Sequence, residues 1–120
     1  MRNQPKYSLF KNASYALKGL KDLITTETSF RLEVIFIVIL LPVLIFIDVS
    51  LTNKLIMFFS LMLIIVVEAL NGAIERAVDL VTSEYHELAG RAKDAASTAV
   101  LFTIILAVVV WGSILIKEIL

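Results

Sequence analysis

The chain has 120 residues, of which 59% are apolar, and its 11 basic and 11 acidic residues leave no net charge. This apolar fraction exceeds that of soluble domains and predicts that lipid surrounds much of the chain. The balanced charge gives no field that favours nucleic acid, so no nucleic-acid partner is expected. The absence of cysteine excludes disulfides, thiolate metal sites and a cysteine nucleophile.

Residues 5–26 have the pattern of an amphipathic helix. Apolar residues recur at steps of three and four from Leu9 to Ile24, while Lys11 and Lys18 fall on the other side. Such a helix suits the membrane surface, but it would equally suit packing against the rest of the protein. No small-residue cleavage site follows the first apolar run, so a cleaved signal peptide is not expected.

Three apolar runs follow, and each is long enough to cross a bilayer, which takes about 20 residues. The predicted spans are 29–48, 52–82 with a cytoplasmic extension, and 88–117. Most basic residues lie before the first span or around the connector between the second and third. This asymmetry places the amino terminus and that connector in the cytoplasm. The fold class is therefore an all-α membrane protein, with three transmembrane helices and an amino-terminal surface helix in a single domain, 1–120.

Four polar residues share one face of the second span, namely Glu68, Asn71, Glu75 and Asp79. Their offsets of three, seven and eleven residues, at about 100° per residue, place them on a single stripe. Glu68 lies about 20 Å along the helix from Leu55, so we expect it inside the hydrocarbon near the cytoplasmic edge. Asn71 and Glu75 then reach the level of the headgroups.

The other spans bring polar residues to the same height. Lys93 and Asp94 open the third span, and Glu27, Arg31 and Glu33 precede the first. Ionisable groups at membrane depth cost free energy and persist mainly where they pair or act. This layer therefore favours a functional site, and the competing interpretation is a hydrogen-bond network that only packs the helices.

Several of the polar residues also have ordinary interpretations. Arg31 and Glu33 are typical interface anchors beside a span. Asp79 and Glu84 fit solvated connector charges equally well. His86, the only histidine, is by itself more typical of a polar surface than of a metal site.

The layer suits phosphoryl transfer, which needs a divalent ion on hard oxygen ligands, a cation near the phosphates and a group that receives the hydroxyl proton. Glu75 with Glu27 could hold Mg2+, and Lys93 could neutralise phosphate. Glu68, the deepest carboxylate, could meet a hydroxyl group presented from the bilayer. No glycine-rich phosphate loop is present, which excludes the soluble kinase folds.

Two motifs carry a family resemblance. The chain reads E-A-L-N-G-A-I-E at residues 68–75 and S-E-Y-H-E-L-A-G-R-A-K-D at residues 83–94. These motifs, and essentially the whole chain, closely resemble the prokaryotic diacylglycerol kinase family. The resemblance implies a homotrimer whose active sites are completed by neighbouring subunits. It also implies the use of MgATP to phosphorylate diacylglycerol to phosphatidic acid in the bacterial inner membrane.

The resemblance further implies roles for individual residues. It makes Glu68 the general base and Glu27 and Glu75 the metal ligands, with Asn71 and Asp79 in support. The residues matched to ATP contacts are Tyr15, Glu27, Glu75, Glu84, Tyr85, His86, Lys93 and Asp94, and those matched to lipid contacts are Glu68, Ser97, Trp111 and Arg31.

One position departs from the family pattern. Relatives often carry an arginine that reaches the nucleotide where this chain has Ser8, and Lys11 or Lys6 would have to substitute for it.

Three alternatives to a diacylglycerol kinase remain open from the sequence. They are an undecaprenol kinase of the same family, a small proton or cation transport subunit, and a structural scaffold.

Overall fold

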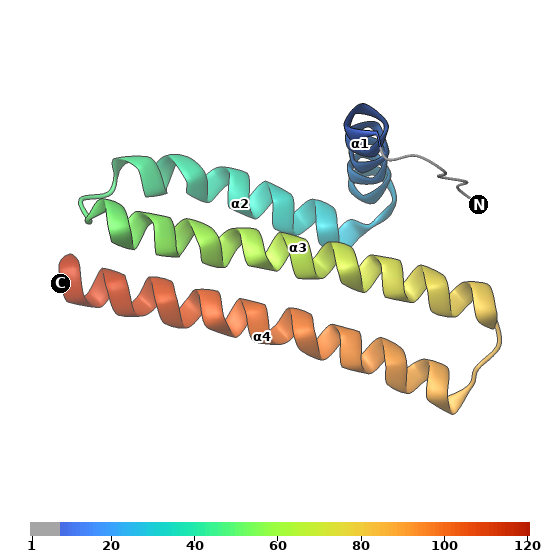
Figure 1. Ribbon diagram of the computed structural model, residues 1–120. Helices are drawn as coiled ribbons and strands as arrows, with labels where there is room; N and C mark the ends of the chain where they lie inside the picture. The colour runs from blue at the N-terminus through green and yellow to red at the C-terminus, as the bar shows by residue number, and fades with distance from the viewer. Residues whose placement is uncertain (1–7) are drawn as a thin grey trace.

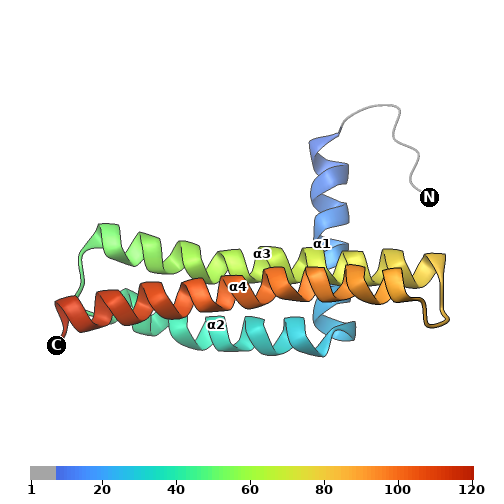
Figure 2. The ribbon, with the colours of Figure 1, turned by 90° about the horizontal axis from the view of Figure 1, so that it is seen from below.

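The computed structural model describes residues 8–120, in which all regular secondary structure is helical. Four α-helices follow one another: α1 (Leu9–Thr26), α2 (Thr28–Phe46), α3 (Leu51–Val81) and α4 (Glu87–Glu118). The helices α2, α3 and α4 run side by side, and α1 crosses away from this bundle (Figures 1 and 2). Because α3 packs against both α2 and α4, it forms the centre of the bundle. The predicted all-helical class is confirmed.

Side-chain caps explain where three of the helices begin. In each case a side chain accepts a hydrogen bond from a backbone amide in the first turn, and so satisfies one of the amides that lack a helical partner. The caps are Ser8 Oγ at 3.3 Å for α1, Ser50 Oγ at 3.2 Å for α3 and His86 Nδ1 at 3.1 Å for α4.

A single residue separates α1 from α2. Glu27 has extended backbone angles, φ −106° and ψ 107°, and is the C-cap of α1 and the N-cap of α2 at once. Its amide donates to the carbonyl of Leu23 at 2.9 Å, and its own carbonyl accepts from Arg31 at 3.0 Å. One extended residue therefore redirects the chain from α1 into the bundle.

The buried residues of the bundle follow heptad spacing. On α3 they recur at steps of four and three, and on α2 they lie seven residues apart, as in helices packed along a common seam. They include Met57, Leu61, Ile64, Glu68 and Asn71 on α3, and Phe30, Ile37 and Leu44 on α2. Apart from Ser60, whose Oγ donates to the carbonyl of Met57 at 2.7 Å, the α3 seam is apolar as far as Ile64, and Glu68 and Asn71 follow as buried polar residues.

The outward surface of the bundle is also apolar. The helices α2, α3 and α4 are each long and apolar enough to cross a membrane. Phe36, Phe59 and Phe102 have exposed fractions of 60%, 66% and 64%. Soluble proteins rarely expose contiguous apolar surface of this kind, so lipid is the surrounding solvent. The structure confirms three candidate membrane spans, where the sequence predicted 29–48, 52–82 and 88–117.

Candidate active site at the connector end

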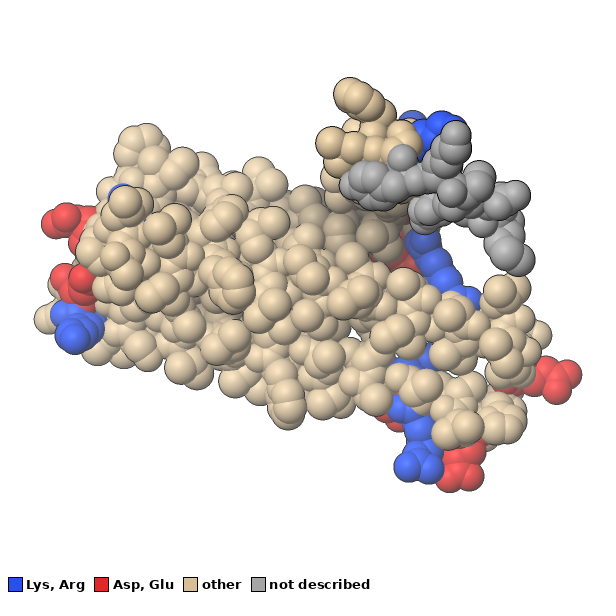
Figure 3. Space-filling view, in the orientation of Figure 1, with Lys and Arg blue, Asp and Glu red and all other residues tan. Residues whose placement is uncertain are grey.

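Charged side chains gather at the two ends of the bundle, with an uncharged stretch between them on the face shown in Figure 3. We call the end where residues 82–86 join α3 to α4 the connector end. The second half of α3, the start of α4 and the junction of α1 with α2 all contribute polar residues toward this end. Many of the residues predicted from the sequence to form a site lie toward this end.

The polar stripe of α3 becomes more exposed toward the connector end. Glu68 and Asn71 are buried, with exposed fractions of 7% and 8%, whereas Glu75 is half-buried and Asp79 is exposed. Asn71 donates from Nδ2 to Oε1 of Glu75 at 2.8 Å. The stripe therefore offers one carboxylate inside the packed bundle and two others progressively closer to its surface.

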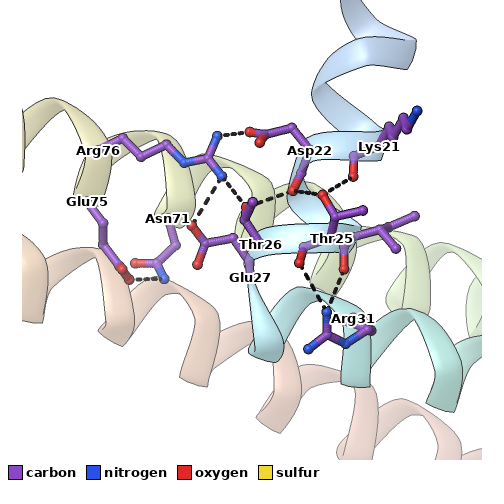
Figure 4. Close-up of polar contacts among 10 residues, drawn as sticks. Lys21, Asp22, Thr25, Thr26, Glu27, Arg31, Asn71, Glu75 and Arg76 are labelled. Carbon is purple, nitrogen blue, oxygen red and sulfur yellow. Dashed lines mark hydrogen bonds and ion pairs between the residues drawn. The ribbon is translucent and has the colours of Figure 1, made fainter.

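Glu27 joins this stripe from the junction of α1 and α2 (Figure 4). Its Oε1 accepts a hydrogen bond from Nη2 of Arg76 at 3.3 Å, and the same nitrogen donates to Oγ1 of Thr26 at 2.9 Å. The other guanidinium nitrogen, Nη1, pairs with Asp22. Since Arg76 directly follows Glu75 on α3, it brings Glu27 to the same level of the bundle as Glu75.

Lys93 meets the far end of the stripe. Its Nζ lies 2.6 Å from Oδ1 of Asp79, and this ion pair joins the start of α4 to the end of α3. A cavity of about 250 Å3 opens beside the pair, and the connector residues Glu84, Tyr85 and His86 line it together with Asp79 and Lys93. The residues expected to contact nucleotide thus include one contiguous set around this cavity.

Other residues named from the sequence lie outside this set. Tyr15 is on α1, which stands apart from the bundle (Figure 1). Asp94 and Ser97 are exposed on α4. Trp111 lies 18 residues beyond Lys93, about 27 Å along the helix axis, and donates from Nε1 to the carbonyl of Met57 at 3.2 Å.

The guanidinium of Arg31 contacts the end of α1. Its Nη1 donates to the carbonyl of Ile24 at 2.9 Å and to that of Thr25 at 3.4 Å. These are among the last carbonyls of α1, which have no partner within the helix. Arg31 therefore caps α1 within its own chain.

Two further residues have burial or contacts that the sequence did not predict. Glu33 has a buried oxygen, Oε2, without a hydrogen-bond partner among residues 8–120, and it is the one ionisable residue lining an otherwise apolar crevice of about 220 Å3 between α2, α3 and α4. A signal was available, because Glu33 falls between Phe30 and Ile37 on the heptad seam of α2. Arg76 is one of the basic residues near the connector that indicated the membrane orientation. No local sequence pattern predicts its partners on α1.

The chain is similar to known proteins over most of its length. The family model described as prokaryotic diacylglycerol kinase matches residues 14–115. The diacylglycerol kinase of Escherichia coli strain K12 is 43% identical over 103 residues, which cover 86% of this chain and 84% of the relative. The diacylglycerol kinase of Haemophilus influenzae is 38% identical over 107 residues, covering 89% and 91%. That of Pseudomonas aeruginosa is 38% identical over 101 residues, covering 84% and 82%.

This chain belongs to the prokaryotic diacylglycerol kinase family. The resemblance noted in the motifs at residues 68–75 and 83–94 is therefore confirmed. Both motifs fall at the connector end, one on the polar half of α3 and the other across the connector into α4. The motifs that carry the resemblance therefore lie in the polar layer predicted from the sequence.

The oxygen atoms of the polar layer fit the divalent metal ion that a kinase of this family is expected to use. No group of three or more His, Cys, Asp or Glu side chains able to hold a metal occurs within residues 8–120. Magnesium is usually bound through one or two carboxylates together with substrate phosphates, rather than by a protein cage. Glu27 and Glu75 supply two carboxylates, and Asn71 adds a buried Oδ1 that has no partner in the described part of the chain.

Ser8, the departure from the family pattern, has a local structural role. It is the N-cap of α1, where its Oγ accepts from the amide of Lys11. Lys11 is exposed in the first turn of the same helix, and Lys6 lies outside the described residues. The residue that would replace the family arginine at the nucleotide thus remains an open prediction.

Proposed function

We propose that this lipid kinase transfers the γ-phosphoryl group of MgATP to the free hydroxyl of diacylglycerol and so forms phosphatidic acid. The observation that carries the proposal is the polarity change along the α3 seam, from Ile64 to Glu68 and Asn71. It puts a buried carboxylate at the inner limit of the membrane-spanning apolar seam. A lipid hydroxyl reaches that level from the bilayer, and a nucleotide reaches it from water.

Glu68 is the proposed general base. Its buried position keeps it away from bulk water and close to a hydroxyl presented by lipid. The hydroxyl oxygen bonds to the γ-phosphorus while the bond from that phosphorus to the bridging β,γ-oxygen breaks. The hydroxyl proton passes to Glu68, and ADP leaves with the bridging oxygen.

Glu27 and Glu75 are the proposed Mg2+ ligands, together with the phosphates of ATP. The bound ion would neutralise charge on the β- and γ-phosphates. Asn71 supports this pair by holding Oε1 of Glu75 through its own Nδ2. The side-chain amide thereby limits the rotation of Glu75 and leaves the second carboxylate oxygen for a ligand.

The nucleotide is proposed to bind around the connector cavity. Lys93 supplies a cation for phosphate, and Asp79 holds that ammonium in place at 2.6 Å. The remaining proposed contacts are the connector residues Glu84, Tyr85 and His86, with Asp94 on α4 and Tyr15 on α1.

The lipid is proposed to lie along the bundle from Glu68 toward the opposite end. The crevice beside Glu33 presents one carboxylate among aliphatic and aromatic side chains, which suits a glycerol backbone followed by acyl chains. Ser97 and Arg31 flank the polar layer. Trp111, about 27 Å from Lys93 along α4, would contact acyl chain and not headgroup.

A homotrimer is proposed because one subunit does not gather all of these groups. The helix α1, which includes Tyr15, stands apart from the bundle (Figures 1 and 2), while Asp94 and Ser97 are exposed on α4. A neighbouring subunit would complete a site that uses both sets. The distribution of basic residues supports a cytoplasmic position for α1 and the connector end, with α1 on the surface of the inner membrane.

The test is phosphorylation of defined lipids by the purified protein in mixed micelles with labelled ATP. We expect rapid, magnesium-dependent labelling of diacylglycerol and much slower labelling of undecaprenol. Preferential labelling of undecaprenol would move the chain to the other substrate class within the family. Cation flux in liposomes without lipid labelling would overturn the proposal, although the α3 seam from Met57 to Ile64 has Ser60 as its one buried polar residue, and that hydroxyl already donates to the carbonyl of Met57.

A further inference from the structure

A single arginine holds the end of α1 on the central helix of the bundle. Arg76, on α3, donates from Nη1 to the carboxylate of Asp22 and from Nη2 to Oγ1 of Thr26 and Oε1 of Glu27 (Figure 4). The contacts span 49 to 54 residues of sequence. The end of α1 and Glu27, the N-cap residue of α2, thus bind the same guanidinium group.

The surfaces around Arg76 are shaped for this close approach. Gly72 lies one turn before Arg76 on α3, and a Cβ atom at that position would meet Cδ2 of Leu23 at 3.3 Å. None of the residues of α1 is buried. The orientation of α1 relative to α3 therefore depends on this small contact and on the ion pairs above it.

Few other contacts hold the junction between α1 and α2 that Arg76 binds. Glu27 is the one extended residue between two helices, and Arg31 holds the carbonyl of Ile24 from the side of α2. Arg31 fixes backbone atoms of α1, whereas Arg76 is the residue that contacts the Glu27 carboxylate itself. Arg76, on α3, thus limits the rotation of the Glu27 side chain.

We propose that Arg76 is a positioning residue that orients the Glu27 carboxylate toward Glu75 for binding of the metal–nucleotide complex. The inference rests on the proposed function, in which Glu27 and Glu75 share the ion. Arg76 contacts Oε1 of Glu27 and leaves Oε2 outside that contact. Its charge also offsets the repulsion between two carboxylates that must approach one cation.

An arginine suits this role better than a lysine. The planar guanidinium directs several N–H groups at fixed angles, so one side chain can hold Asp22, Thr26 and Glu27 together. Lysine has a single ammonium on a flexible stem and would keep the charge but not the geometry. Groups that orient metal ligands typically change metal affinity by about 10–100-fold when they are removed.

The test compares Arg76→Gln, Arg76→Lys and the control Arg91→Gln, which removes an exposed arginine on α4 without an ion pair in the described structure. Binding of Mn2+ is measured by electron paramagnetic resonance in the presence of a non-hydrolysable ATP analogue. Hydrogen exchange of residues 23–28 is followed on the same samples. Turnover is measured as a function of Mg2+.

We expect Arg76→Gln to weaken Mn2+ binding about tenfold or more, with Arg76→Lys intermediate and Arg91→Gln within about twofold of the parent protein. The Mg2+ concentration for half-maximal turnover should rise in parallel, while kcat at saturating Mg2+ changes little. Should Arg76→Gln not fold, the comparison of Arg76→Lys with Arg91→Gln decides.

Three results would overturn the inference. They are unchanged Mn2+ binding in both Arg76 variants, equal losses in Arg76→Gln and Arg91→Gln, and faster exchange at the junction without any loss of metal affinity. The last result would make Arg76 a structural clamp only. Because Mn2+ binding is measured without lipid turnover, a parent protein that binds metal and nucleotide but does not phosphorylate diacylglycerol would refute the proposed function and leave this inference standing.

Discussion

Asn71 donates from its side-chain Nδ2 to Oε1 of Glu75 at 2.8 Å, one helical turn away on α3. The amide is buried, and its Oδ1 finds no partner in residues 8–120. A buried acceptor without a partner costs free energy unless a ligand or water satisfies it. This pair therefore links the packed seam of the bundle to the carboxylate proposed to hold magnesium.

Removing the Asn71 side chain should weaken metal binding. In Asn71→Ala, Glu75 loses the hydrogen bond that orients it, so the Mg2+ concentration for half-maximal turnover should rise about tenfold. Magnesium titrations of initial rate measure this. Asn53→Ala, at the opposite end of the same helix, is the control and should behave as the parent. If both variants showed the same magnesium dependence, Asn71 would have no role in supporting the metal site.

Lys93 should act on the nucleotide more than on stability. The Lys93–Asp79 pair is largely solvent-accessible, with exposed side-chain fractions of 41% and 60%, so breaking it should change the stability of the protein little. Lys93→Gln should raise the KM for ATP about tenfold or more, because it removes a charged phosphate contact. Asp79→Asn, which keeps the positive charge of Lys93 but weakens its partner, should have a smaller effect. A larger effect from Asp79→Asn would reverse the assigned roles.

Trp111 should contribute mainly to packing of α3 against α4. Trp111→Phe keeps an aromatic ring but loses the hydrogen bond to the carbonyl of Met57, which should lower the free energy of unfolding by about 1 kcal/mol. Unfolding in mixed micelles followed by circular dichroism measures this, with Ser113→Ala as the control. Unchanged stability would contradict this packing role, and lost lipid phosphorylation would then leave only the proposed contact with the acyl chain.

Gly72 should tolerate a methyl group but not a larger side chain. Its Cβ would meet Cδ2 of Leu23 at 3.3 Å, and the end of a leucine side chain can move by that amount. Gly72→Ala should therefore keep near-parental activity and gain about 1 kcal/mol in helix propensity. Gly72→Leu should push α1 off α3 and reduce activity. Leu23→Ala should restore part of that loss in the double variant, and a double variant no better than Gly72→Leu would contradict this packing.

The sequence predicted the parts of the site that depend on local periodicity. Apolar runs of membrane length predicted three spans, and a period of 3.6 residues placed Glu68, Asn71 and Glu75 on one face of a helix. The structure shows that this face is the seam of the bundle, with Glu68 and Asn71 buried in it. Both results follow from short-range geometry, which a sequence encodes directly.

The contacts of Arg76 could not be predicted in the same way. They depend on the direction that the chain takes at Glu27, where one extended residue decides how α1 returns toward α3. No periodic pattern encodes that direction. Glu33 was interpreted as an interface anchor because it lies at the start of a span, although its place on the seam between Phe30 and Ile37 indicated burial.

The central claim is that the buried carboxylate of Glu68 accepts the proton of a lipid hydroxyl during phosphoryl transfer. The most direct test is the rate of phosphatidic acid formation by Glu68→Gln, measured with saturating MgATP and diacylglycerol. Glu118→Gln, a carboxylate at the opposite end of the bundle, is the matched control. The account predicts a fall of about 10²–10⁴-fold for Glu68→Gln, with assembly and Mn2+–nucleotide binding retained and Glu118→Gln unaffected. A Glu68→Gln protein that phosphorylates diacylglycerol at the parental rate would contradict it.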